Sequence, residues 1–258
     1  MDLRDPAGRI VNVVTSPQGG TVALRRFFRQ QFRAEAANAA RVRSTGLWLD
    51  LNGKLDLEEN QMDMKRLKKQ MDFILEIDKE KNIKRQTLIT DASRQETDAE
   101  HAWHLAVMCA LLSEYSNEKI DVAHTMLMVL MHDLVEIDAG DTYAYDEEAN
   151  KSKEERELKA ADRIYNLLPP DQAKMARELW DEFEAMETPE SKFANTLDKI
   201  QPAILNDAAG GVSWTSHTVY IDQILKRDAR VHEGSEVLWE YTKNILDENV
   251  KNGNIKTR

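Results

Sequence analysis

Four residues whose side chains bind metal ions stand in separate apolar segments of the chain. His132 and Asp133 are adjacent in the run MLMVLMHDLVEIDAGDT. His101 lies upstream in ETDAEHAWHLAV, and Asp198 lies downstream in FANTLDKIQP. Each of these groups is costly to bury without a partner, whereas two imidazoles and two carboxylates can share one cation. The series predicts a site for one divalent ion such as Mn, Co, Fe, Ni or Zn.

Two further carboxylates follow the His-Asp pair. Glu136 comes one helical turn after His132, on the same helix face, where it can reach a water or a substrate oxygen at a metal. Asp141 follows Gly140 and can approach the same space. We predict that both carboxylates are catalytic. The alternatives are a solvated helix-end carboxylate for Glu136 and a turn residue or helix cap for Asp141.

Cationic side chains precede the first histidine of the series. Arg85 and Arg94 lie in the segment before His101, and Lys84 is a weaker candidate. A guanidinium group suits bidentate recognition of phosphate, so both arginines are predicted to bind an anionic substrate beside the metal. A solvent-facing position in a loop is the alternative for each of them.

Three other residues with reactive side chains have ordinary interpretations. His104 lies one turn after His101, and His124 precedes His132 by eight residues. A second metal is an alternative for these two, but surface or core histidines are the favoured interpretation. Cys109 stands in the apolar run LAVMCALL and is predicted to be a buried structural thiol rather than a nucleophile.

The segments that carry these residues have helical patterns. Leu67, Met71, Ile74 and Leu75 follow the spacing of one helix face. The segment KRQTLITDASRQETD then predicts a loop, and the Thr-x-x-Glu pattern that ends at Glu100 predicts a capping box for the helix of His101.

Helix boundaries are also visible further along the chain. Asp121 is a predicted N-cap for a helix that continues through His132 to a stop at Gly140. A helix is expected to restart at Asp171, and Thr188-Pro189 to begin the helix of Asp198. Two weaker helices are expected near residues 218–230 and 236–250. Because no segment shows sustained period-two alternation, the predicted class is all-α.

Composition limits the function classes. The chain has 258 residues, of which 41% are hydrophobic and 31% charged, and its formal net charge is -11. This charge argues against binding of a nucleic acid polymer but allows a small anionic substrate in a local pocket. No apolar run approaches the roughly 20 residues that span a bilayer. With one cysteine, the sequence favours a reducing compartment, and we predict a cytoplasmic protein without membrane contact.

The first 53 residues differ in composition from the rest. They contain eight arginines, no lysine and four acidic residues, whereas the remainder is strongly acidic. The stretch TVALRRFFRQQFRAEAANAARVRS is basic and partly amphipathic, which is typical of a targeting segment or a basic arm. The alternative is an upstream extension with no role in the main fold, because Met62 or Met64 would make a natural start.

The ligand series His101…His132-Asp133…Asp198 resembles the signature of the HD-domain metal-dependent phosphohydrolases. The longer strings AEHAWHLAVM, MHDLVEIDAGDT and LLPPDQ…ELWDEFEA…ETPE are similar to the branch that contains the bacterial 5'-deoxynucleotidases. The likeness covers about residues 62–250, which we predict to form an HD phosphohydrolase domain, and leaves residues 1–53 unmatched.

The resemblance implies an all-helical bundle with one divalent metal between its central helices. It implies that the two histidines and two aspartates hold this metal, and that the family's characteristic Glu and Asp fall on Glu136 and Asp141. It places the family's substrate arginine on Arg85. The deoxynucleotidases follow that arginine with a tryptophan beside the sugar, whereas this chain has Gln86. A homodimer is a further implication of the resemblance.

The main hypothesis is divalent-metal-dependent hydrolysis of (deoxy)nucleoside 5'-monophosphates to nucleoside and phosphate. Gln86 keeps a second hypothesis open, in which the substrate is a phosphodiester, a nucleoside triphosphate or a non-nucleotide phosphate. A third hypothesis is a non-catalytic, metal-stabilised nucleotide-binding domain with the acidic helix near residues 146–163 as a partner surface. The presence of Glu136 and Asp141 counts against it.

Overall fold

The computed structural model describes residues 55–258, and these residues are predominantly α-helical, which confirms the predicted all-α class. The predicted extension over residues 1–53 lies outside the described residues. The helices are α2 (Leu55–Ile77), α3 (Asp98–Leu112), α4 (Val122–Met131), α5 (Glu136–Ala139), α6 (Glu147–Asn150), α7 (Lys153–Tyr165), α8 (Pro170–Ala185), α9 (Pro189–Ala208), α10 (Val212–His217), α11 (Ile221–Arg227), α12 (Val231–Gly234) and α13 (Glu236–Lys251). Three short 3-10 helices are η1 (Asp78–Asn82), η2 (Ser113–Tyr115) and η3 (His132–Val135). None of the helices in this range is long and apolar enough to cross a membrane.

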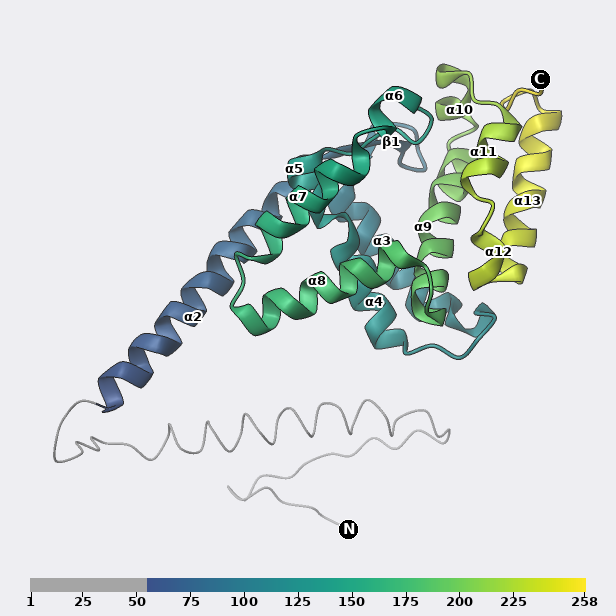
Figure 1. Ribbon diagram of the computed structural model, residues 1–258. Coiled ribbons are helices and arrows are strands. Elements are labelled where there is room, and N and C mark those ends of the chain that lie inside the picture. Colours follow the sequence, from purple (N-terminus) through teal and green to yellow (C-terminus); the bar gives the residue numbers. More distant parts are fainter. Residues whose placement is uncertain (1–54) are drawn as a thin grey trace, which may run out of the picture. The chain divides into compact units, whose positions relative to one another are not determined.

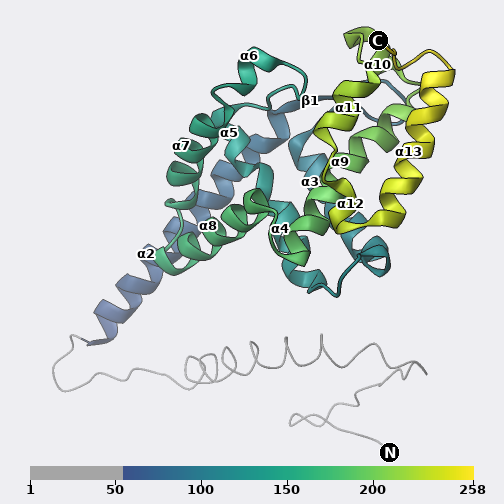
Figure 2. The ribbon, with the colours of Figure 1, turned by 45° about the vertical axis from the view of Figure 1, so that its right-hand side comes forward.

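The main hydrophobic core lies between α3, α4, α8 and α9. Leu105 from α3, Met128 from α4 and Phe193 and Leu197 from α9 are fully buried there. Helix α9 runs through the middle of the molecule, with α2, α7 and α8 on one side and α10 to α13 on the other (Figures 1 and 2). The segments that carry His101, His132 and Asp198 therefore meet at the centre of the bundle.

Two smaller cores flank the main one. Phe73 of α2 packs with Ile164 and Tyr165 of α7, and the Tyr165 hydroxyl donates a 2.9 Å hydrogen bond to the Met131 carbonyl. On the other side, Trp214 of α10 packs in a cluster with Ala203 of α9 and side chains from α11 and α13. One flanking core thus joins α2 to α7, and the other joins α9 to α10, α11 and α13.

Side-chain caps fix the starts of the helices that carry the site. Thr97 forms the predicted capping box with Glu100. The Asp121 side chain accepts hydrogen bonds from the backbone N–H groups of Ala123 and His124. At α9, Thr188 caps the helix and Ser191 completes a reciprocal pair. These predictions are confirmed. Helix α8 starts at Pro170 rather than at Asp171, because proline is readily accepted in the first turn of a helix.

A short β-hairpin occupies the segment that the sequence predicts as a loop. Strands β1 (Lys84–Leu88) and β2 (Gln95–Thr97) pair antiparallel, with Lys84 opposite Thr97 and Leu88 opposite Gln95. With five and three residues, the strands are too short to give a readable alternation. The loop prediction is therefore wrong at this point, and the pairing brings Arg85 and Gln86 towards α9.

The helix predicted to run from Asp121 to Gly140 is interrupted. Helix α4 ends at Met131, η3 contains His132 and Asp133, and α5 follows until Gly140. Tight 3-10 turns are common at helix C-termini, and the change of pitch alters where successive side chains point. Gly140 has φ of +75°, which glycine adopts without strain, so the predicted stop is confirmed. The helix expected near residues 236–250 is confirmed as α13, and the helix expected near 218–230 is present as the shorter α11.

The apolar stripe of α2 lies on one face as predicted, but that face is exposed. Leu67, Met71, Ile74 and Leu75 are between 41% and 72% exposed. The opposite side of the helix makes the contacts with the bundle, through Phe73, through the ion pair of Arg66 with Asp171 and through the hydrogen bond between Gln70 and Gln172.

Close packing between α12 and α9 generates a stability prediction. A Cβ atom added at Gly234 would lie 2.5 Å from Thr196 Oγ1 and closer still to the Lys192 carbonyl. We expect Gly234→Ala to lower the free energy of unfolding by about 1–3 kcal/mol, measured by urea denaturation. Asp247→Ala, at an exposed position of α13, should change it by less than about 0.5 kcal/mol. Equal stability of both variants would show that this helix contact is not tight.

Candidate active site

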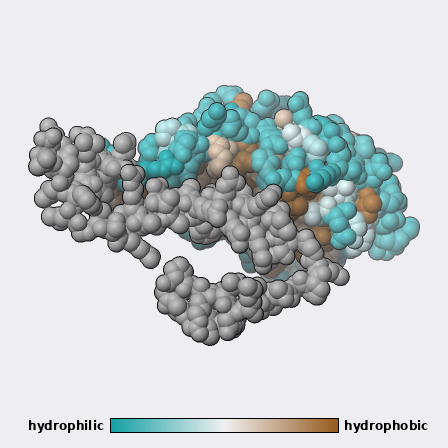
Figure 3. Space-filling model, turned by 90° about the horizontal axis from the view of Figure 1, so that it is seen from below, coloured by the Kyte–Doolittle hydropathy of each residue, from teal (hydrophilic) through white to brown (hydrophobic). Residues whose placement is uncertain are grey.

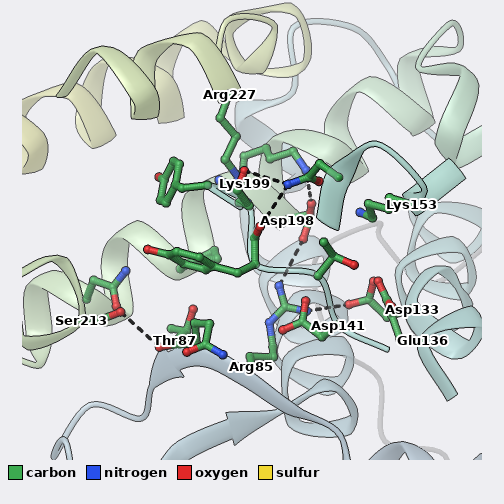
Figure 4. A pocket seen from close by; sticks show the side chains of 18 of the residues that line it. Arg85, Thr87, Asp133, Glu136, Asp141, Lys153, Asp198, Lys199, Ser213 and Arg227 are labelled. Carbon is green, nitrogen blue, oxygen red and sulfur yellow. Dashed lines mark hydrogen bonds and ion pairs between the residues drawn. The ribbon is translucent and has the colours of Figure 1, made fainter. Parts of the chain in front are cut away.

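A polar pocket opens beside the middle of α9. Its cavity volume is about 260 Å³. The walls come from β1, η3, α5, the loop after Gly140, α7, α9, α10 and α11, and Figure 4 shows their side chains converging. The charged lining residues are Arg85, Asp133, Glu136, Asp141, Lys153, Asp198, Lys199 and Arg227. The predicted residues Arg85, Gln86, Asp133, Glu136, Asp141 and Asp198 all line this pocket.

The four predicted metal ligands lie close together at its base. One ligand atom each from His101, His132 and Asp133 falls within 4.8 Å of the others. Asp198 Oδ1 lies 3.0 Å from His101 Nε2 and 3.8 Å from His132 Nε2. The buried His132 Nε2 makes no hydrogen bond to any residue in the described range. An unpaired buried nitrogen beside carboxylate oxygens fits a divalent ion, whose ligands in proteins are such N and O atoms.

Hydrogen bonds to the far side of each imidazole set the tautomer. His132 Nδ1 donates to the Val129 carbonyl at 2.8 Å, because a carbonyl can only accept. His101 Nδ1 donates to Gln201 Oε1 at 3.0 Å, and Gln201 Nε2 in turn donates to Glu96 Oε1 at 2.7 Å. Both Nε2 atoms are thereby directed towards Asp198. Such outer contacts orient metal-binding histidines.

Burial and neighbouring charges set the protonation of the two histidines. Burial, helped by the nearby Arg85 cation, lowers the pKa of His101 to about 4, so this ring is neutral. Burial also opposes protonation of His132, but the carboxylates of Asp133 and Asp198 outweigh it and raise the pKa of His132 well above its ordinary value. Without a metal, a proton on His132 therefore partly neutralises the carboxylates.

Arg85 is the cation at the centre of the pocket floor. Its Nη1 donates to Asp133 Oδ2 at 2.8 Å and to Asp98 Oδ1 at 3.2 Å. Burial works against its charge, yet the surrounding carboxylates, Asp133 first, raise the pKa of Arg85 above its ordinary value. Arg94, in contrast, does not line the pocket. Its side chain is exposed and forms a two-point ion pair with Glu100.

Glu136 and Asp141 face the pocket from the two sides of Gly140. Glu136 is buried, and its Oε2 has no hydrogen-bond partner in the described part of the chain. Burial and the nearby Asp133 carboxylate raise the pKa of Glu136 to about 10, and burial also raises that of Asp141. Glu136 can therefore hold a proton at its carboxyl group until a positive charge enters the pocket.

Three cationic residues of the pocket were not predicted from the sequence. Lys199 Nζ lies 2.8 Å from Asp198 Oδ2, Lys153 Nζ lies 3.2 Å from a Glu157 oxygen, and Arg227 comes from α11. Adjacency to Asp198 could have indicated Lys199. Lys153 and Arg227 stand in helices without a motif, and the tertiary fold alone brings them here.

The remaining reactive candidates have ordinary places. His104 Nδ1 accepts a 3.1 Å hydrogen bond from Gln201, and His124 pairs with Glu182 at 2.7 Å, away from the pocket lining. Cys109 is buried, and burial raises the pKa of its thiol to about 12, which agrees with the predicted structural role.

The chain is similar to proteins described as phosphohydrolases or 5'-deoxynucleotidases. A crystal structure of a predicted metal-dependent phosphohydrolase from Magnetospirillum magnetotacticum MS-1 has 48% identity and a TM-score of 0.70, over 74% of this chain and 95% of that one. The human 5'-deoxynucleotidase HDDC2 is 30% identical over 111 residues, 43% of this chain and 53% of the relative. The Xenopus laevis protein of the same name is 31% identical over 108 residues, 42% and 52% of the two chains. The chain thus matches about half the length of these curated relatives.

A family model described as HD domain matches residues 77–239, which include every predicted metal ligand and the whole central bundle. The match covers well over half of the chain, and the similar crystal structure covers most of the described residues. This chain belongs to the HD-domain family of metal-dependent phosphohydrolases.

Proposed function

We propose that the protein hydrolyses nucleoside 5'-monophosphates to nucleoside and phosphate with one divalent ion held by His101, His132, Asp133 and Asp198. The observation that carries the proposal is the convergence of these ligand atoms at the floor of a pocket lined by Arg85 and Glu136. The names of the HDDC2 relatives support a nucleotide substrate.

The charges of the pocket suit a phosphate monoester. Its lining carries four cationic and four acidic side chains, so a divalent ion would leave an excess of two positive charges. That excess matches the two negative charges of a phosphate monoester near neutral pH. A divalent ion supplies Lewis acidity, which polarises a phosphate oxygen and activates water.

The side chains supply the other parts of the reaction. Glu136 is proposed to move a proton between its carboxyl group and the attacking water. Arg85, Lys153 and Lys199 line the pocket and can offset phosphate charge as the ester bond breaks. Asp141 shares the space next to Glu136 and is proposed to orient the substrate. Arg94 is not retained as a substrate-binding residue because of its exposed position.

The sugar and base preference is a separate question. Gln86 lines the pocket where the deoxynucleotidases are expected to place tryptophan, and its backbone carbonyl accepts a 3.1 Å hydrogen bond from Ser213. Because this residue has no aromatic ring beside the sugar, hydrolysis of another phosphate ester is the second candidate function. A panel of nucleoside monophosphates, triphosphates, phosphodiesters and sugar phosphates, with each divalent metal, separates the two.

We also propose that the protein forms a homodimer and is located in the cytoplasm. Exposed apolar side chains support self-association: Met64, Leu67, Met71, Ile74 and Leu75 on α2, and Trp103, Val107 and Leu111 on α3. Figure 3 shows separate hydrophobic areas on an otherwise mostly hydrophilic face. The cytoplasm is inferred from the single cysteine.

Removal of a metal ligand tests the proposed reaction. We expect His132→Ala and Asp133→Ala to lower kcat for nucleoside monophosphates by at least about a hundredfold, because metal activation of water supplies several kcal/mol. Phosphate release with Mn or Co is the measurement. His124→Ala is the matched control and should retain activity, since His124 lies outside the pocket. Undiminished phosphate release by the two ligand variants would overturn the mechanism.

Gln201 should act on metal affinity through the orientation of His101. Gln201→Leu removes the acceptor for His101 Nδ1 and is expected to weaken metal binding about 10- to 100-fold, measured by calorimetric titration. Gln172→Leu on α8 is the matched control, because Gln172 hydrogen-bonds with Gln70 of α2 and does not line the pocket. Equal affinities for the two variants would exclude an orienting role for Gln201.

Proton release gives a pH test of the same site. Since the pKa of His132 is raised in the metal-free protein, metal binding must displace a proton from its ring. We expect apparent metal affinity to rise with pH, by about tenfold per unit while that proton is displaced. Titrations in buffers with different ionisation enthalpies measure the released proton. Affinity independent of pH, with no proton released, would contradict the assignment.

A further inference from the structure

The pocket extends along α9 away from the proposed metal ligands. Asp198, Pro202 and Asn206 all line it, and they are spaced four residues apart on one face of the helix. The eight residues from Asp198 to Asn206 rise about 12 Å along the helix axis. Figure 4 shows the same extension, with Asp133 and Glu136 on one side of the pocket and Thr87 and Ser213 on the other. A phosphate at the metal end leaves room for the rest of an ester at the Asn206 end.

Asn206 is a buried residue whose amide oxygen has no hydrogen-bond partner in the described part of the chain. Its side chain is 7% exposed, and its Oδ1 makes no hydrogen bond within residues 55–258. A buried amide pays a substantial desolvation penalty when its hydrogen bonds are not made, so such groups usually have a partner. Because Asn206 lines the pocket, a ligand in the pocket can supply this partner. Rotation of the amide lets it present a donor, an acceptor or both.

Aromatic side chains gather at the same end. Tyr143, Tyr145 and Trp214 line the pocket. Trp214 packs in the cluster of Ala203, one turn before Asn206 on α9, and Tyr145 packs against that cluster. The ring centroids of Tyr143 and Tyr145 are 5.3 Å apart in an edge-to-face arrangement. This end of the pocket therefore combines aromatic side chains with the Asn206 amide and with the polar residues Thr87 and Ser213.

The loop that carries the tyrosines is held in place. Asn150 donates a 3.1 Å hydrogen bond to the Tyr143 carbonyl, and Arg156 donates to Thr142 Oγ1 at 2.8 Å and to the Ala139 carbonyl. The same loop begins with Asp141 at the metal end. One anchored segment thus connects the proposed reaction centre to the aromatic end of the pocket.

We propose that the Asn206 end of the pocket is a nucleobase subsite, in which the Asn206 amide reads the hydrogen-bonding edge of the base and the aromatic side chains contact its faces. Asparagine pairs with base edges through its adjacent donor and acceptor, and aromatic rings stack on bases. The inference rests on the proposed nucleotidase function and adds that the base contributes to substrate selection.

The experiment compares each nucleotide with a substrate that lacks the base. The values of kcat/KM are measured for four nucleoside 5'-monophosphates and for ribose 5-phosphate, in wild type, Asn206→Leu, Asn206→Asp and the control Asn244→Asp at an exposed position of α13. Asn206→Leu should lower the values for nucleotides by roughly tenfold and leave ribose 5-phosphate within about twofold. Asn206→Asp, which keeps the shape of the side chain, should change the order of preference among the bases.

Two outcomes would overturn the nucleobase subsite alone, and a third would overturn the nucleotidase function as well. Equal losses on nucleotides and ribose 5-phosphate in both Asn206 variants, with melting temperatures unchanged, would make Asn206 a residue of the reaction centre or the scaffold and overturn the subsite. Unchanged values for all substrates would overturn it as well. If wild type releases phosphate from ribose 5-phosphate but from no nucleotide, the nucleotidase proposal fails, and the subsite with it.

Discussion

The burial of several carboxylates around one arginine is the constraint on which the structure depends. Glu96, Asp98, Glu136 and Asp198 are all buried, and Asp133 is close to Arg85 on the pocket floor. Arg85, Lys153, Lys199 and a proton on His132 offset only part of this charge, and buried charge without compensation is costly. Glu96 Oε2, Asp98 Oδ2 and Glu136 Oε2 accordingly lack hydrogen-bond partners among the described residues. A divalent ion would add positive charge where the Nε2 atoms of His101 and His132 face Asp198.

The scaffold meets this constraint by building much of the site on one central helix. Helix α9 carries Asp198 and is packed between α3, α4, α12 and α13. Pro202 follows Asp198 by four residues, so the Asp198 carbonyl lacks its usual helical donor at the edge of the pocket. Gln201, on the same helix, reaches the opposite nitrogen of His101. The same helix thus provides a ligand, an orienting residue and the lining of the pocket.

The sequence indicates the candidate metal ligands more readily than the cations around them, for a physical reason. His101, His132, Asp133 and Asp198 are each unfavourable in an apolar helix, so their positions are readable without knowledge of the fold. Lys153 and Arg227 are ordinary on a helix surface, and only tertiary packing shows that they face a pocket. The hairpin of β1 and β2 is too short for a periodic signal. For α2, periodicity identifies the apolar face but not whether the bundle covers it.

A crystal structure grown with Mn²⁺ and measured near the manganese absorption edge tests the central claim most directly. The account predicts one anomalous peak bonded to His101 Nε2, His132 Nε2, Asp133 and Asp198, at distances of roughly 2.0–2.3 Å. The hydrogen bonds of His101 with Gln201 and of His132 with the Val129 carbonyl should persist. A peak held by other residues, or no peak at saturating Mn²⁺ while Arg85 stays paired with Asp133, would contradict it.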